Sequence, residues 1–194
     1  MTKSKIIAVT NKILHQLEGT RETSSGKALL AKMRRSVGKK LSETVEIWPF
    51  VFGYLPEEFI GDNEEKAIVL SMQFYSLHQQ GVETSVLYEH EKSANTNVFT
   101  LGKSLSVLRT EDDRVAVDRR FNTMITATTF EELEYHLRHL LMLLKSKSRE
   151  TKVDYAQLAE DLYWILRGFD ENIRLKWARD YYRTYQKGEN LNDN

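Results

Sequence analysis

Hydrophobic residues recur at every third or fourth position along most of the chain rather than at alternate positions. This spacing is typical of amphipathic helices and not of half-buried strands. In the N-terminal half it predicts a helix from Ile6 that ends at Gly19, where glycine adopts a left-handed C-cap without strain. A second helix ends at Gly38, and residues 47–52 form a short buried corner. A third helix ends at Gly81.

The predicted helices begin at residues that can cap free backbone N–H groups. Capping boxes, in which a second polar residue follows three positions later, mark residues 62–65, 129–132 and 154–157. In the C-terminal half helices are expected over residues 101–108, 117–125, 133–144 and 158–166, with Gly168 as a stop, and over 173–181. The predicted N-terminal residues of these helices include Asp62, Thr100, Thr129, Asp154 and Asp170.

The periodicity fades over residues 81–97, where polar side chains dominate as they do in a connection between two lobes. A boundary near Asn95 divides the chain into an N-terminal helical lobe, 1–94, and a C-terminal helical lobe, 98–187, followed by a frayed polar tail, 188–194. The sequence therefore predicts an all-α, two-lobed helical bundle protein of about eight to ten helices.

Composition agrees with a helical class and gives no support to an enzyme. Nine Gly and two Pro are too few for the many turns of an all-β fold. The absence of Cys excludes disulfides and thiolate metal sites, and with no apolar run of membrane or signal length we expect a soluble, cytoplasmic protein. No GxxxxGK or GxGxxG loop, GxSxG elbow or HExxH pair is present, so no cofactor and no catalytic residue is predicted.

The total charge of zero, from 28 basic and 28 acidic residues, conceals two opposed segments. Residues 21–40 carry seven basic side chains and one acid, whereas residues 43–65 carry seven acids and no base. On the predicted second helix Lys27, Arg34 and Arg35 project from the side opposite the apolar residues, which suits contact with a phosphate backbone. The alternative is an ordinary solvated helix face. Further basic clusters lie at 114–120 and 138–152.

The order and spacing of several short runs in the C-terminal half carry a family resemblance. These runs are Leu101–Leu105, Arg119–Ala127, Leu137–Leu141, Val153–Leu158 and Tyr163–Trp164. Together they resemble the CasB family, the small subunit of the type I-E CRISPR surveillance complex Cascade. The N-terminal run Ala31–Arg35 and the corner at Trp48–Phe50 are also similar to the family.

The resemblance implies an all-helical subunit that is not an enzyme and is present in two copies along a crRNA-guided complex. It implies partners: other Cascade subunits, a second copy of itself, crRNA and target DNA. The subunit would contact the crRNA–target duplex through its backbone and stabilise the displaced strand of the R-loop. The residues matched to backbone contact are Arg34, Arg35, Lys103, Arg119, Arg120 and Arg138. Charge alone adds Lys27, Lys32, Lys39 and Lys40.

Two other functions are compatible with the sequence. A helical adaptor would only bridge protein subunits and would dock through the acidic stretch 43–65. A metal-dependent hydrolase would be centred on His136 and His139, which lie three residues apart with Glu132 one turn before. A helical metal site needs at least a third ligand, and the sequence nominates none, so solvated or interface histidines are favoured and no metal is predicted.

Overall fold

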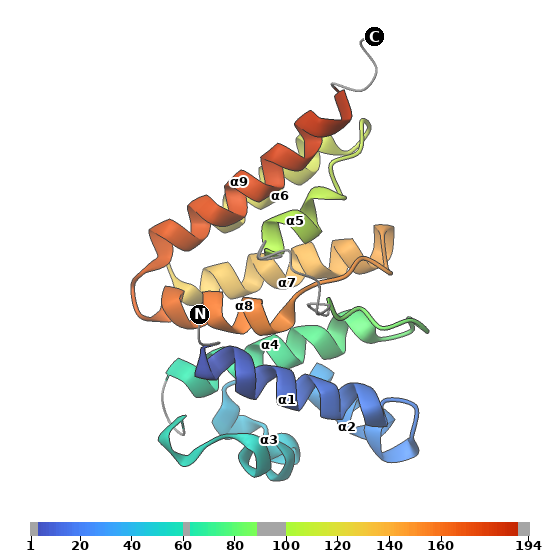
Figure 1. The fold of residues 1–194 in the computed structure, drawn as a ribbon, viewed down its shortest axis with the longest axis vertical. Coiled ribbons are helices and arrows are strands. Elements are labelled where there is room, and N and C mark those ends of the chain that lie inside the picture. Colours follow the sequence, from blue (N-terminus) through green and yellow to red (C-terminus); the bar gives the residue numbers. More distant parts are fainter. Residues whose placement is uncertain (1–3, 60–62, 89–99, 190–194) are drawn as a thin grey trace.

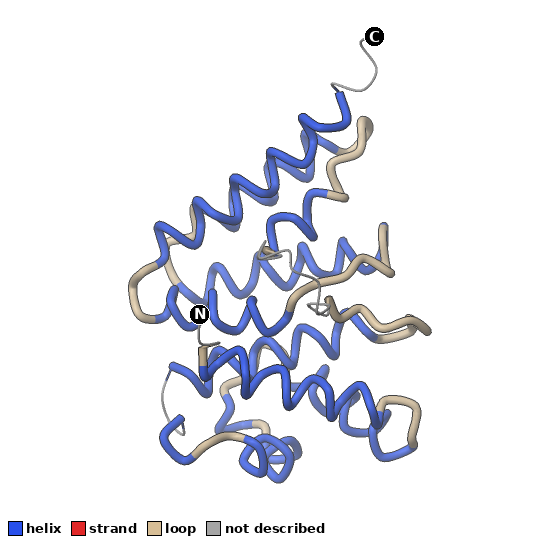
Figure 2. The backbone as a smooth tube through the Cα atoms, viewed as in Figure 1, coloured by secondary structure: helices blue, strands red, loops and turns tan. Residues whose placement is uncertain are grey.

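The computed structural model describes residues 4–59, 63–88 and 100–189, with side chains described up to residue 183. Helices account for the regular structure of this part of the chain, and the single β feature there is an isolated parallel bridge between Leu87 and Val153 (Figures 1 and 2). The all-α prediction is therefore confirmed. The helices are α1 (Lys5–Thr20), α2 (Ser24–Ser36), α3 (Trp48–Tyr54), α4 (Asn63–Gln79), α5 (Leu101–Ser106), α6 (Arg114–Ile125), α7 (Phe130–Lys147), α8 (Tyr155–Leu166) and α9 (Asp170–Glu189). Short 3-10 helices span Leu41–Glu43, Val45–Ile47 and Glu57–Phe59.

Three of the predicted helix starts are capped as the sequence indicates. The side chains of Thr100, Thr129 and Asp154 accept hydrogen bonds from the backbone N–H groups three residues later. Each bond satisfies one of the N–H groups that a helix start leaves without a backbone partner. At the other ends, Gly81 and Gly168 have φ angles of 72° and 82°, the left-handed conformation expected of glycines that follow a helix.

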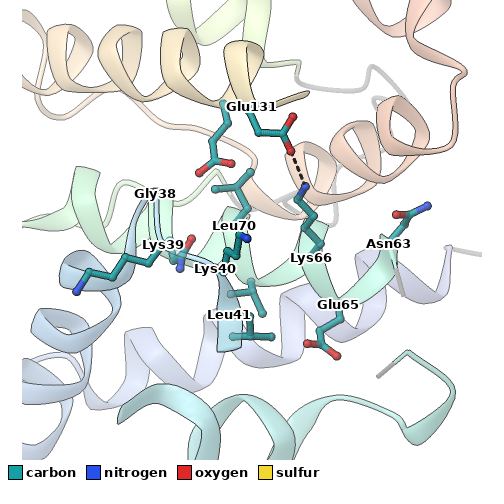
Figure 3. Close-up of a pocket in the computed structure, with 12 residues that line it drawn as sticks. Gly38, Lys39, Lys40, Leu41, Asn63, Glu65, Lys66, Leu70 and Glu131 are labelled. Atoms are coloured by element: carbon teal, nitrogen blue, oxygen red, sulfur yellow. Dashed lines mark hydrogen bonds and ion pairs between the residues drawn. The ribbon is translucent and has the colours of Figure 1, made fainter. Parts of the chain in front are cut away.

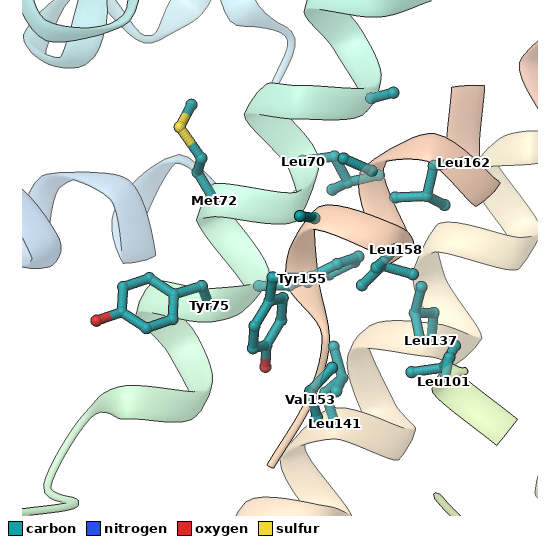
Figure 4. Close-up of a cluster of buried hydrophobic side chains, with 14 of the residues drawn as sticks. Leu70, Met72, Tyr75, Leu101, Leu137, Leu141, Val153, Tyr155, Leu158 and Leu162 are labelled. Atoms are coloured by element: carbon teal, nitrogen blue, oxygen red, sulfur yellow. The ribbon is translucent and has the colours of Figure 1, made fainter. Parts of the chain in front are cut away.

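The core lies where α4 meets α8 and α7 (Figure 4), and α1 also packs against α4 and α8. α4 is buried almost all round, because it lies between helices of both halves of the chain (Figure 1). Two buried polar contacts lock α4 to α8: the Ser71 hydroxyl donates to the Tyr155 carbonyl over 2.5 Å, and His78 Nδ1 lies 2.9 Å from the Tyr155 hydroxyl. Helices from the two predicted lobes thus share one core, and the division into lobes stays a prediction.

α5 and α9 approach each other closely at one glycine. A Cβ atom on Gly102 would lie 1.9 Å from the backbone oxygen of Trp177, a distance that no side chain tolerates. Only glycine therefore permits this packing. α9 in turn packs on α6, where the rings of Tyr181 and Phe121 stack with centroids 3.7 Å apart. Gly102 therefore affects the position of α6 indirectly, through its contact with α9.

The structure corrects three sequence predictions. Gly19 lies inside α1 and does not have a positive φ, because the helix continues to Thr20. The helix expected up to Leu108 is shorter and ends at Ser106. The corner at residues 47–52 is only partly buried, since Phe52 is 39% exposed. Asp62 and the boundary near Asn95 lie outside the described residues.

Candidate nucleic-acid interface

The ten basic residues predicted to contact nucleic acid all reach the surface, but they lie in separate regions. Seven are exposed, and Lys32, Arg34 and Arg138 are half-buried. α2 presents its basic residues on two different flanks, and α6 presents its own beside α7. The exposed ones are Lys27, Arg35, Lys39, Lys40, Lys103, Arg119 and Arg120.

One flank of α2 faces the acidic segment that follows it. Lys32, Arg35 and Lys39 line a small pocket of about 60 Å³ together with Glu43 and Glu46. The guanidinium of Arg35 lies 3.3 Å from the Glu46 carboxylate. We call this group of five the α2 charged pocket. The opposed charges of the two sequence segments partly neutralise each other here. Lys27, near the start of the same helix, is likewise 3.4 Å from Glu22.

The other flank of α2 meets α7, and Arg34 on this flank forms no ion pair among the described residues, although Glu134 of α7 attracts the nearby Arg138. Arg34 lies close enough to Lys145 to lower its pKa, in addition to the larger lowering by burial. Burial and Arg35 lower the pKa of Arg34 itself. The Lys145 ammonium donates to the Leu77 carbonyl at the end of α4 over 3.0 Å. Two cations are thus held together near a helix C-terminus, where the backbone carbonyls favour positive charge.

Arg138 lies two turns before Lys145, on the same side of α7. Its guanidinium is 3.5 Å from the position of a Cβ atom on Gly38, directly after α2. The buried Nε of Arg138 has no hydrogen-bond partner among the described residues. Arg34, Arg138 and Lys145 together form what we call the α2–α7 basic cluster. Lys145, which the sequence placed only in a general basic stretch, joins the cluster through packing.

A larger cavity of about 600 Å³ lies between the turn after α2, α4 and α7 (Figure 3). Lys39 and Lys40 line it, but so do Glu131 and Glu134 of α7. Glu131 forms an ion pair with Lys66 over 3.3 Å, and burial raises the pKa of Glu134. This mixture of signs makes the cavity a poor site for a polyanion.

A groove between α6 and α7 has a different character. Its lining contains cations, aromatic rings and no carboxylate, and encloses about 240 Å³. Arg119 and Arg120 are exposed and, among residues whose side chains are described, form no ion pair. We call this site the α6–α7 groove. Its lining consists of Arg119, Arg120, Thr123, Tyr135, His136, His139 and Leu140.

The residues next to the two arginines fix the orientation of α6. Arg109 holds Asp118 with two hydrogen bonds of 2.7 and 3.1 Å, and the Tyr181 hydroxyl donates a third over 2.8 Å. Burial raises the pKa of Asp118, but these hydrogen bonds outweigh it and hold the pKa below its ordinary value. With Asp118 and Phe121 turned inward, Arg119 and Arg120 face solvent.

The remaining candidates lie apart. Lys103 is exposed in the short helix α5. His136 and His139 line the α6–α7 groove, where His136 is 3.9 Å from Glu132. Within the described residues no group of three His, Cys, Asp or Glu side chains could hold a metal ion.

Tyr135 is the residue of the groove that sequence reasoning missed. It is 58% exposed and directly precedes His136 in the chain. An exposed aromatic residue on an amphipathic helix was the available signal, but only the packing of α6 against α7 brings it beside Arg119 and Arg120. None of the described helices has the length and apolar character needed to cross a membrane.

The chain is similar to one protein family and to several solved structures. The model of the family described as CRISPR-associated protein Cse2 matches residues 29–182. The fold is similar to CasB from Thermobifida fusca, at 22% identity over 93% of this chain and 99% of that chain, with a TM-score of 0.71. CasB from M. ruber is 24% identical over 98% and 99%, with a TM-score of 0.66.

A chain of a structure described as a CRISPR RNA-guided surveillance complex is also similar, at 18% identity over 96% of this chain and 98% of that chain. Its TM-score is 0.71. These likenesses show a common fold along almost the entire length of each chain. The comparison with curated proteins found no match.

Proposed function

The chain belongs to the CRISPR-associated Cse2 family, and we propose that it is a non-enzymatic subunit of an RNA-guided surveillance complex. The observation that carries the proposal is the family match over residues 29–182, supported by the common fold with a chain of such a complex. Its partners would be the other subunits and a second copy of itself, in the cytoplasm. In this role the subunit contacts the backbone of the crRNA–target duplex and stabilises the displaced DNA strand.

The charge distribution supports backbone contact through particular residues. Phosphate binding needs cations that are accessible and not already paired with carboxylates. Arg119 and Arg120 in the α6–α7 groove meet both conditions among the described residues. Arg34 and Lys145 of the α2–α7 basic cluster repel each other, so a bound phosphate between them would relieve unfavourable electrostatic energy. Arg35 meets the conditions less well because Glu46 already holds it.

The test uses the assembled complex, reconstituted with guide RNA and a variant carrying Arg34→Ala, Arg35→Ala, Arg119→Ala and Arg120→Ala. Affinity for a double-stranded DNA target is measured over a range of salt concentrations. Loss of each phosphate contact lowers the slope of log affinity against log salt by about 0.7–0.9. We expect weaker target binding and a shallower slope. Unchanged affinity and slope would contradict the proposal.

A control that removes the same charge as Arg119→Ala with Arg120→Ala replaces Lys5 and Lys12 of α1, which are both exposed and whose helix does not line the α6–α7 groove. The control should bind the target as the unmodified complex does. Assembly is followed separately by size-exclusion chromatography. A four-residue variant that fails to assemble would instead favour the helical adaptor that only bridges protein subunits.

A further inference from the structure

We propose that the α6–α7 groove binds one unpaired nucleotide, with Tyr135 stacking on the base and Arg119 and Arg120 contacting the flanking phosphates. The inference rests on the proposed function and deepens it, because it names single-stranded nucleic acid as the ligand of this groove. The α6–α7 groove combines an exposed aromatic ring with unpaired cations. The α2 charged pocket and the cavity beside α4 lack this combination.

Tyr135 presents an accessible aromatic surface at a fixed position. Its side chain belongs to α7, whose backbone is rigidly packed through Leu133 and Leu137, yet the residue is 58% exposed. The Tyr135 ring lies 4.3 Å from the His139 ring and 5.2 Å from the His136 ring, centroid to centroid. A ring supported in this way loses little conformational freedom when a base stacks on it, so stacking costs little entropy.

His139 is oriented by a hydrogen bond of 2.7 Å between its Nδ1 and the Tyr135 carbonyl. Because a carbonyl oxygen only accepts, Nδ1 carries the proton and Nε2 is left to contact a ligand. In neutral His139, Nε2 accepts a hydrogen bond from a base amino group, which the guanidinium groups cannot do. The groove therefore combines a stacking surface, a hydrogen-bond acceptor and phosphate ligands.

The size of the groove favours one base over a larger ligand. Its volume of about 240 Å³ falls below the roughly 300–1,000 Å³ of typical small-molecule pockets. A duplex cannot use the Tyr135 ring, because its bases are stacked on each other, whereas every unpaired base offers a free face. The arginines alone would serve either form of nucleic acid. Tyr135 is therefore the residue that discriminates between them.

The experiment uses the full chain and a single-stranded DNA oligonucleotide that carries the fluorescent base 2-aminopurine, whose emission falls when it stacks. Binding is measured at low salt for the unmodified protein, for Tyr135→Ala and for Tyr135→Phe. The same sequence as a duplex is measured in parallel. Because Tyr135 is exposed, both variants should fold, and circular dichroism verifies this.

We expect the unmodified protein and Tyr135→Phe to quench 2-aminopurine, and Tyr135→Ala to lose the quenching and to bind single strands on the order of tenfold more weakly. Duplex affinity should be equal in all three proteins. The proposal is overturned if the unmodified protein gives no quenching, if Tyr135→Ala quenches normally, or if it weakens both forms equally.

The outcomes also separate this inference from the proposed function. If Tyr135→Ala binds single strands normally while the four-residue cation variant weakens target binding by the complex, only the stacking site is wrong. If an acidic protein segment covers Tyr135 in the assembled complex and DNA does not contact it, the groove is a protein-docking surface. The inference then fails.

Discussion

The α2 charged pocket and the α6–α7 groove both contain cations that the sequence nominates for nucleic acid, yet they differ in what surrounds those cations. In the first, Glu43 and Glu46 lie among the three basic side chains, and Arg35 is already paired. In the second, Arg119 and Arg120 lie among aromatic and imidazole rings with no carboxylate in the lining. The segment with the larger local excess of positive charge is the more neutralised of the two.

This difference shows that charge along the sequence and charge on the surface are separate quantities. Residues 21–40 and 43–65 are neighbours in the chain, so their opposite charges meet after a single turn. The 114–120 cluster is shorter, but its neighbours in space come from α7, which presents Tyr135 and two histidines on that side. We therefore expect the two regions to contribute unequally to nucleic-acid binding.

The largest expected effect on target binding comes from removing the two arginines of the α6–α7 groove, compared with removing two cations of the α2 charged pocket. Arg119→Ala with Arg120→Ala should weaken target binding by the assembled complex by about 3 kcal/mol, roughly 100-fold, because each guanidinium loses a charge-assisted contact. Lys32→Ala with Arg35→Ala removes the same charge but should cost less than about 1 kcal/mol, since Arg35 is already paired. Electrophoretic mobility shift at fixed salt measures both. If both double variants lost the same binding free energy, the two regions would contribute equally and the proposed difference between them would be wrong.

The next effect concerns the scaffold that positions α6. Gly102→Ala places a methyl group against the Trp177 carbonyl and should lower the free energy of unfolding by about 3 kcal/mol. Urea denaturation measures the loss, and hydrogen exchange should show α9 and α6 opening before α2. Gly19→Ala is the matched control, because nothing lies within 4 Å of its Cβ position, and it should stabilise α1 by about 0.5–1 kcal/mol. A Gly102→Ala protein as stable as the unmodified chain would refute the close α5–α9 contact.

Local sequence signals predicted the helices well because caps and apolar spacing act within a few residues. The Thr129 and Asp154 caps and the apolar side of α7 are examples. Features that depend on packing between distant segments were beyond such signals. Arg34 meets Lys145, and Tyr135 meets Arg119, only after α7 has docked on its neighbours. Trp164, although beside the apolar residues of α8, is 38% exposed.

A pH effect is expected at the buried junction of α4 with α8, where His78 lies. Burial, with a smaller contribution from Lys145, lowers the pKa of His78 from 6.5 to about 4. Since the folded protein favours neutral His78, its contribution to stability is complete above pH 6.5 and is lost as pH falls towards 4, by about 2–3 kcal/mol. Urea unfolding between pH 7 and 4.5 should show this loss, and His78→Gln should remove it. An unchanged pH slope in His78→Gln would show that other groups cause the acid sensitivity.

The smallest effect has the opposite sign. Glu46→Gln removes the carboxylate that holds Arg35 and frees this arginine for phosphate. Because the pair is exposed, stability should change by less than about 1 kcal/mol. Target affinity should rise a few-fold, and the salt slope should become steeper by at most about 0.9. A fall in affinity would mean that Glu46 orients Arg35 for binding instead of competing with the nucleic acid.

Photo-crosslinking most directly tests whether the α6–α7 groove, rather than the α2 charged pocket, contacts nucleic acid. A target DNA with 5-iododeoxyuridine in the displaced strand is bound to the assembled complex and irradiated, and crosslinked peptides are identified by mass spectrometry. Our account predicts crosslinks in α6 and α7, on peptides containing Arg119, Arg120 or Tyr135. Crosslinks confined to residues 27–47, with none in α6 or α7, would contradict it.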